Sequence, residues 1–231
     1  MIHTSINALI GLKLTSFIKD KNLLSTAIII GLILPDLDFI LDFILSLFLN
    51  YDFLYNPYIS NSIFHSLFMI PFLSLLILIY LEYTNQNNSY IVIGLSLGML
   101  AHVIIDVISF NSIGIFFPLF DLKSSFGLTN YFNIQFSSKI IKIFYTFDFF
   151  FYRLYTLSII NLIIINKIDN FRIIKKLTIF MKIQLYIFLL FLLLIYFDVS
   201  NNTFSSLFGL FYTLCFLMTF YMTCKSRTII N

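Results

Sequence analysis

The sequence predicts an all-α fold, a polytopic transmembrane helical bundle of about six to seven helices. Two observations predict it. The 231 residues are 60% hydrophobic and only 11% charged, with a mean hydropathy of +0.97. A soluble domain is near half apolar and a quarter charged, so this chain lacks the polar residues needed to cover a core in water. Long apolar stretches also recur, each near the length a helix needs to cross hydrocarbon.

These apolar stretches set the expected order of helices. They run over about 23–49, 62–81, 90–110, 143–165, 183–197 and 204–223. A shorter segment, 2–18, is apolar enough to form a seventh helix, either spanning or half-inserted. Nothing between them resembles an independent soluble domain. We therefore expect one integral membrane domain over 1–231, with 1–120 as the motif-bearing half containing the metal site and 121–231 as additional transmembrane helices.

Basic residues in the polar breaks predict the orientation of the chain in the membrane. The break at 166–182 holds Lys167, Arg172, Lys175, Lys176 and Lys182. The positive-inside rule makes this break cytoplasmic, and alternation puts Lys225 and the break at 82–89 on the same side. From Phe171 to Lys182 apolar and basic residues alternate, as in a helix lying on an anionic surface or in an ordinary cytoplasmic loop.

The charge pattern also limits the partners. The net charge is only +3, and the basic residues lie at segment ends rather than on one continuous stripe. A nucleic-acid partner is therefore not expected, and membrane lipids are.

Ionisable residues inside the apolar segments are the strongest chemical signal, because each costs a few kcal/mol and usually faces a partner or a cavity. They are Asp36, Asp38, Asp42, His65, His102 and Asp106. His102 and Asp106 are four apart, so one helix face can present both to a metal ion or a water. Imidazole and carboxylate ligands without thiolate favour an open catalytic metal centre. The alternative is a hydrogen-bonded pair that joins two helices.

Pro35 predicts a break in the second apolar segment. It disfavours helix at Leu34 and frees backbone groups at membrane depth, which requires a buried or water-lined setting. Asp36 and Asp38 would point about 200° apart on a regular helix. Both can serve one site only at a distorted turn or by bracketing two metals, and Asp42 is the alternative partner of Asp38.

The remaining histidines are weaker signals individually. His65 lies at a loop-to-helix junction, where a cap or an interfacial residue is the alternative to a ligand. His3 could stay in solvent near the N-terminus. With the expected orientation, however, Asp36, His65 and His102 lie at one depth in three segments. His3 joins them if the segment 2–18 crosses the membrane.

Two further pairs have structural interpretations. Gly94 and Gly98 form a G-x-x-x-G, which favours close helix packing beside the face of His102. Asp148 and Arg153 share one apolar segment and could pair with each other.

Four short motifs follow one another in an order that resembles a known family. They are His3, Leu34-Pro35-Asp36-Leu37-Asp38, Phe64-His65-Ser66, and Gly98-Met99-Leu100-Ala101-His102-Val103-Ile104-Ile105-Asp106 with Phe117-Pro118 downstream. In order and spacing, residues 1–120 resemble the LexA-binding, inner-membrane-associated hydrolase family, also called membrane-bound metal-dependent hydrolases. The resemblance implies a helical membrane protein with a divalent-metal centre. It also implies a distant relation to zinc-dependent phospholipases C, which cleave phosphodiester bonds.

The chain departs from that family pattern just before His65. Ser60 and Asn61 stand where the family has a histidine and an arginine, and Ser62 and Phe64 stand where it has a glycine and a threonine. Loss of the arginine removes a bidentate partner for phosphate or carboxylate. The departures therefore predict a changed substrate or a degenerate, inactive member.

The leading hypothesis is a membrane-embedded metal-dependent hydrolase acting on a phosphoester of a lipid or another membrane-accessible molecule. Its expected metal ligands are His3, Asp36, His65, His102 and Asp106. Asp38 is expected to be the catalytic general base or a bridging ligand. Zinc is the expected metal, with manganese or iron as alternatives. The rivals are a transporter or channel that uses buried Asp and His groups, and a non-catalytic membrane protein whose polar cluster only joins helices.

Overall fold

The computed structural model of the chain is all-helical in the part that it describes. That part comprises residues 4–16, 18, 23–55, 57, 59, 63–86, 88–108, 114–118, 136–166 and 171–226. The helices are α1 (Thr4–Thr15), α2 (Leu24–Ile33), the 3-10 helix η1 (Leu34–Asp36), α3 (Leu37–Leu49), α4 (Met69–Tyr83), α5 (Ser89–Ile108), α7 (Ser138–Ile165), α8 (Phe171–Tyr196) and α9 (Asn201–Lys225). The described ranges contain no strand, so the predicted fold class is confirmed.

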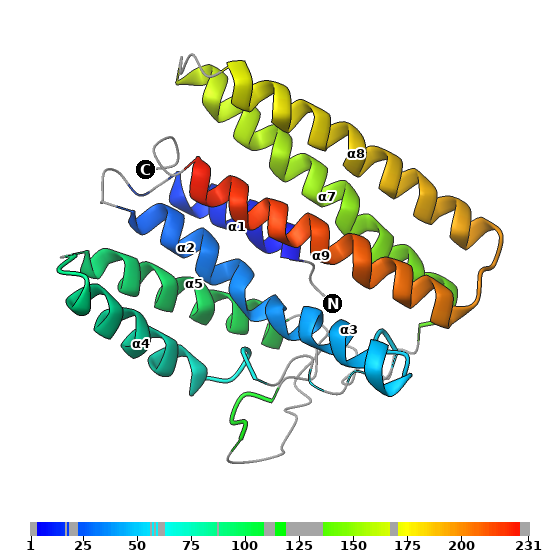
Figure 1. The fold of residues 1–231 in the computed structure, drawn as a ribbon, viewed down its shortest axis with the longest axis horizontal. Coiled ribbons are helices and arrows are strands. Elements are labelled where there is room, and N and C mark those ends of the chain that lie inside the picture. The colour runs from blue at the N-terminus through cyan, green and yellow to red at the C-terminus, as the bar shows by residue number, and fades with distance from the viewer. Residues whose placement is uncertain are drawn as a thin grey trace.

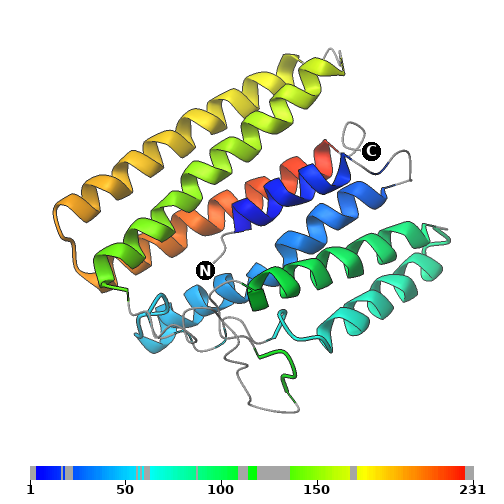
Figure 2. The same cartoon turned by 180° about the vertical axis from the view of Figure 1, so that it is seen from behind.

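The helices lie side by side in a spatial order that differs from their order along the chain. Figure 1 shows the pair α7 and α8 at one side, α9 and α1 in the middle, then α2, and finally the pair α5 and α4. The view from behind shows the same order (Figure 2). In both views the α4–α5 turn, the C-terminal end of α7 with the N-terminal end of α8, and the C-terminal end of α9 lie at one end of the bundle. The sequence predicted that these three regions share the cytoplasmic side.

The helices differ in how far they can cross a bilayer. Among the described residues, α5, α7, α8 and α9 are long and apolar enough to span it. The helix α1 has 12 residues, which is roughly 18 Å of helix against about 30 Å of hydrocarbon. Its length therefore fits the half-inserted alternative. The helix α4 begins at Met69, later than expected, because residues 63–68 form turns.

Glycines bring α2 and α5 into backbone contact. A Cβ at Gly98 would overlap the Ile28 carbonyl oxygen and the Gly31 backbone, and a Cβ at Gly31 would overlap the Leu95 carbonyl oxygen. Gly94 meets the first turn of α2 in the same way. Small residues allow such close approach between membrane helices. The prediction that Gly94 and Gly98 permit close packing is confirmed, and this contact fixes α5 against the break that follows α2.

Aromatic side chains fill the space between α7, α8 and α9. Phe149, Phe191, Phe204 and Phe208 are fully buried. The ring of Phe149 lies 5.0 Å from that of Phe191 and 5.2 Å from that of Phe208 between centroids. Such tilted and edge-on pairs add to the packing energy of large side chains. This half of the molecule therefore forms an apolar support for α1 and the polar residues beyond it.

Candidate metal centre

The break between α2 and α3 positions the first two aspartates. Pro35 lies in the first turn of η1, and because it has no N–H, the α-helical hydrogen bonds of α2 do not continue through it. The tighter 3-10 turn ends at Asp36, and Asp38 follows in the first turn of α3. The two carboxylates thereby reach one region from a distorted turn, one of the arrangements expected from the sequence.

His65 belongs to a turn that is fastened to another loop. The Ser66 hydroxyl donates to the Phe117 carbonyl oxygen at 2.5 Å, and the Leu67 N–H donates to the Ile115 carbonyl oxygen at 2.9 Å. The Phe64 N–H donates to Asp38 Oδ2 at 3.0 Å. These bonds explain why His65 points into the bundle although it lies outside any helix.

Three side chains from three parts of the chain form one group, and Asp106 lies beside its two histidines. Ligand atoms of Asp36, His65 and His102 lie within 4.8 Å of one another. The distance from His102 Nε2 to His65 Nε2 is 3.2 Å, and the distance to Asp36 Oδ1 is 3.8 Å. Asp106 Oδ2 lies 3.3 Å from His65 Nε2 and 3.4 Å from His102 Nε2. The structure thus brings together four of the predicted metal ligands.

The other nitrogen of each histidine is held by an acceptor. The Nδ1 of His65 lies 3.1 Å from Asp38 Oδ2, and the Nδ1 of His102 lies 2.6 Å from the Leu32 carbonyl oxygen. An N–H at Nδ1 satisfies both acceptors, and this leaves each Nε2 with a lone pair. Metal-bound histidines are oriented in this way by carboxylates and backbone carbonyls.

Two Nε2 lone pairs that face each other at 3.2 Å need a cation or a shared proton between them. Tetrahedral ligands that each bind zinc at 2.0–2.1 Å lie about 3.3 Å from one another. The spacings among His65, His102 and Asp106, which are 3.2, 3.3 and 3.4 Å, agree with that geometry, and Asp36 Oδ1 lies farther away, at 3.8 Å from His102 Nε2. The arrangement therefore fits a small divalent metal ion with nitrogen and oxygen ligands.

Burial adds to the need for a positive charge. His65, His102 and Asp106 are buried, and the Asp36 side chain is 14% exposed. Asp36 Oδ2 and Asp38 Oδ1 have no hydrogen-bond partner among the described residues. Buried carboxylate oxygens are costly unless they are paired or coordinate a metal. The side of the cluster at Asp36 is its more open side.

The remaining predicted residues have different outcomes. His3 lies outside the described residues, as do Ser60, Asn61 and Ser62. Asp42, the alternative partner of Asp38, lies in another setting: its Oδ1 accepts from the Tyr51 hydroxyl at 2.8 Å and from the Ile59 N–H at 2.9 Å. Asp42 therefore anchors the loop that follows α3.

Polar residues of α1 also face the centre, and the sequence analysis did not identify them. Asn7 Nδ2 lies 3.0 Å from His102 Nδ1. Its Oδ1 is buried without a partner within the described ranges. Turning the amide by 180° would place that oxygen on the His102 N–H, an assignment that hydrogen-bond networks decide. The available signal was that Asn7 lies within an apolar segment.

The expected pair of Asp148 with Arg153 is wrong. Asp148 Oδ1 accepts hydrogen bonds from the Ser5 hydroxyl and from the Ser5 N–H, the latter at 3.3 Å. Next to it, the Thr4 and Tyr212 hydroxyls bond to each other. Residues five apart on a helix do not share a face, so Asp148 faces α1. A second buried polar cluster therefore joins α1 to α7 and α9.

Comparison with known proteins identifies a family. A family model described as YdjM inner membrane protein matches residues 1–226. No curated protein and no solved structure matches the chain. The matched range includes the metal-centre residues and all the helices described above.

Proposed function

This chain belongs to the YdjM inner membrane protein family, and from that premise we propose that it is a metal-dependent hydrolase of the inner membrane. Its substrate class is a phosphoester of a lipid or of another membrane-accessible molecule. The observation that carries the proposal is the pair of Nε2 atoms 3.2 Å apart with carboxylates beside both. A site made only of imidazole and carboxylate groups resembles open catalytic centres more than closed structural ones.

Four residues would hold the metal, with zinc as the first choice. They are Asp36, His65, His102 and Asp106, and His3 remains a further ligand candidate from the sequence. A divalent metal here would supply Lewis-acid polarisation of a phosphoryl oxygen and a more acidic water. The 14% exposure of the Asp36 side chain makes this the side from which substrate would approach.

Two aspartates would have different roles in the reaction: one would orient a histidine, and the other would accept a proton. Asp38 Oδ2 holds the Nδ1 side of His65 and the Phe64 N–H, so we assign it to orientation of His65. Asp36 Oδ2 has no partner in the described part of the chain, and the Asp36 side chain is the most exposed of the four in the cluster. We assign proton acceptance to Asp36, in place of the general-base role expected for Asp38.

Turnover by purified protein tests the proposal. Wild type and His102→Ala are assayed with zinc on bis(para-nitrophenyl) phosphate and on vesicles of anionic phospholipid. Ser96→Ala is the control, because Ser96 lies on α5 and bonds to Ser74 rather than to the cluster. We expect phosphoester cleavage by wild type and by Ser96→Ala. The rate for His102→Ala should be at least about 100-fold lower, because removal of one residue from a group that acts together in catalysis removes most of the activity.

Two outcomes would contradict hydrolysis. Equal rates for wild type and His102→Ala would place any cleavage elsewhere. Zinc uptake into proteoliposomes without turnover of either substrate would instead support transport through the buried Asp and His groups.

A further inference from the structure

A second site lies far from the metal centre, at the end of the bundle where α7 and α8 are connected. A cleft there is formed by the last turns of α7, the first turns of α8 and the last turns of α9. Its mouth carries Arg172 and Lys176 of α8 and Lys225 of α9. By the positive-inside rule this is the cytoplasmic end.

Among the described residues, no acidic side chain neutralises the three cations at the mouth. All three are exposed, and no acidic side chain lines the cleft among the described residues. No ion pair to any of them is present within the described ranges. Arg172 and Lys176 are four apart, so they lie on one face of α8. Three like charges around one opening repel one another, and an anion between them would relieve that repulsion.

Apolar side chains also line the same cleft. Ile159 and Ile163 line it from α7, and Met218 lines it from α9. Met218 precedes Lys225 by seven residues, which places it roughly 10 Å deeper along the helix. A free anion would gain nothing from this wall. A glycerophospholipid has an anionic headgroup followed by apolar acyl chains. Its headgroup therefore suits the basic residues of the cleft, and its acyl chains suit the apolar residues.

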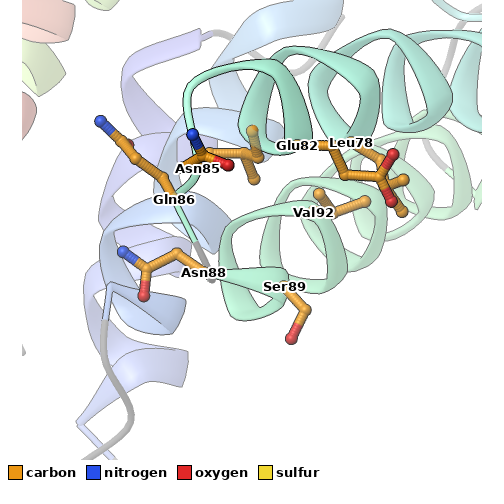
Figure 3. Close-up of a pocket in the computed structure, with 8 residues that line it drawn as sticks. Leu78, Glu82, Asn85, Gln86, Asn88, Ser89 and Val92 are labelled. Carbon is orange, nitrogen blue, oxygen red and sulfur yellow. The ribbon is translucent and has the colours of Figure 1, made fainter.

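The α4–α5 connection offers an internal comparison at the same end of the bundle. The cleft there is lined by Glu82 and by the amides of Asn85, Gln86 and Asn88, as Figure 3 shows. No basic residue lines it in the part of the chain that the structure describes. Exposure at this end of the molecule therefore does not by itself produce a basic cleft.

We propose that the cleft between α7, α8 and α9 binds an anionic phospholipid of the cytoplasmic leaflet. Its phosphate lies among Arg172, Lys176 and Lys225, and one acyl chain follows Ile159 and Met218 into the membrane. Basic pockets between membrane helices on the cytoplasmic side bind anionic headgroups by this combination of charge and depth. The site needs no metal and is separate from the proposed catalytic centre.

Native mass spectrometry of the full chain in detergent tests this proposal. Phosphatidylglycerol or phosphatidylcholine is titrated onto wild type, onto Arg172→Gln/Lys176→Gln, and onto the control Lys175→Gln/Lys182→Gln. The control removes the same charge from α8 at exposed positions that do not line the cleft. All four positions are exposed, so both variants should fold, which thermal unfolding checks.

We expect wild type and the control to retain phosphatidylglycerol in preference to phosphatidylcholine. The cleft variant should bind phosphatidylglycerol about 30-fold more weakly, since each basic residue near an anionic surface contributes about fivefold. Equal loss in both variants would show general charge attraction and overturn the site. Competition by inorganic phosphate or glycerophosphoglycerol as strong as that by the intact lipid would also overturn it, because the apolar wall would then contribute nothing.

Discussion

The two sides of the bundle are held together by different means. On the side of α2 and α5, glycine backbones touch, and buried polar groups lie at the break after α2. On the side of α7, α8 and α9, large aromatic rings fill the contacts. Lipid is as apolar as a leucine side chain, so both sides depend on packing and hydrogen bonds rather than on a hydrophobic driving force between helices.

The contacts expected to contribute most to stability and the residues proposed to bind metal therefore lie on different sides of the bundle. The side of α2 and α5 carries the residues proposed to bind metal, and its close backbone contact leaves little freedom to reposition them. The aromatic side carries none of these four residues. Changes on the two sides should therefore have different signatures: loss of stability with an intact metal site on one side, and loss of metal on the other.

The largest effect on stability is expected from Phe208→Ala. Phe208 is fully buried, and its ring lies 5.2 Å from that of Phe149 and 5.7 Å from that of Tyr212. Removal of such a ring leaves a cavity and costs about 3–5 kcal/mol. Unfolding in detergent measures the loss, and Leu210→Ala is the control because Leu210 is 49% exposed. Bound metal per folded protein should not change, and a matching loss of metal would show that the two sides are not separable.

Gly98→Ala should have a smaller effect on stability and a clear one on metal. Its Cβ would overlap the α2 backbone, so α2 and α5 must move apart at a cost of about 1–3 kcal/mol. Gly11→Ala is the control, because a Cβ there meets two side-chain atoms at 3.1 Å and the Ile29 Cα at 3.3 Å, whereas a Cβ at Gly98 meets the Ile28 carbonyl oxygen at 2.3 Å. We expect weaker zinc binding for Gly98→Ala alone. Normal zinc affinity in that variant would mean that the α2–α5 contact does not position the site.

Asp38→Asn should weaken metal binding without abolishing it. An amide holds His65 Nδ1 less well than a carboxylate, and loss of such an orienting partner costs about 10–100-fold in metal affinity. Asp42→Asn is the control, since Asp42 is also buried on α3 but bonds to the loop. Chelator competition measures the affinities. Turnover at saturating zinc should recover; an Asp38→Asn protein that holds zinc but stays inactive would restore Asp38 as the general base.

The sequence predicted the helical fold and most of the candidate metal centre because of the low polarity of the helices. Charged groups are rare in apolar helices, so Asp36, His65, His102 and Asp106 stood out against their surroundings. The spacing of His102 and Asp106 also gave their shared helix face directly. Family order then supported a single site, and the structure places these four side chains together.

Other features depended on the path of the backbone, which spacing does not determine. Asp38 and Asp42 are equivalent on a helix, yet only Asp38 reaches His65, because the turn at 63–68 docks there. His102 is held by the backbone carbonyl of Leu32, and any residue type at position 32 would supply that carbonyl, so the residue type there gives no signal. Asn7 and Ser5 carry no charge, so their position within an apolar segment was only a weak signal and did not identify His102 and Asp148 as their partners.

Metal analysis of purified protein tests the central claim most directly. Wild type, His102→Ala, Asp106→Ala and the control Ser96→Ala are equilibrated with zinc, passed through a desalting column and analysed for bound metal per folded chain. We predict about one zinc in wild type and in Ser96→Ala, and less than about a tenth of that in the two cluster variants, because loss of a direct ligand exceeds the 10–100-fold cost of losing an orienting partner. Equal metal content in all four proteins would contradict a metal centre at this cluster.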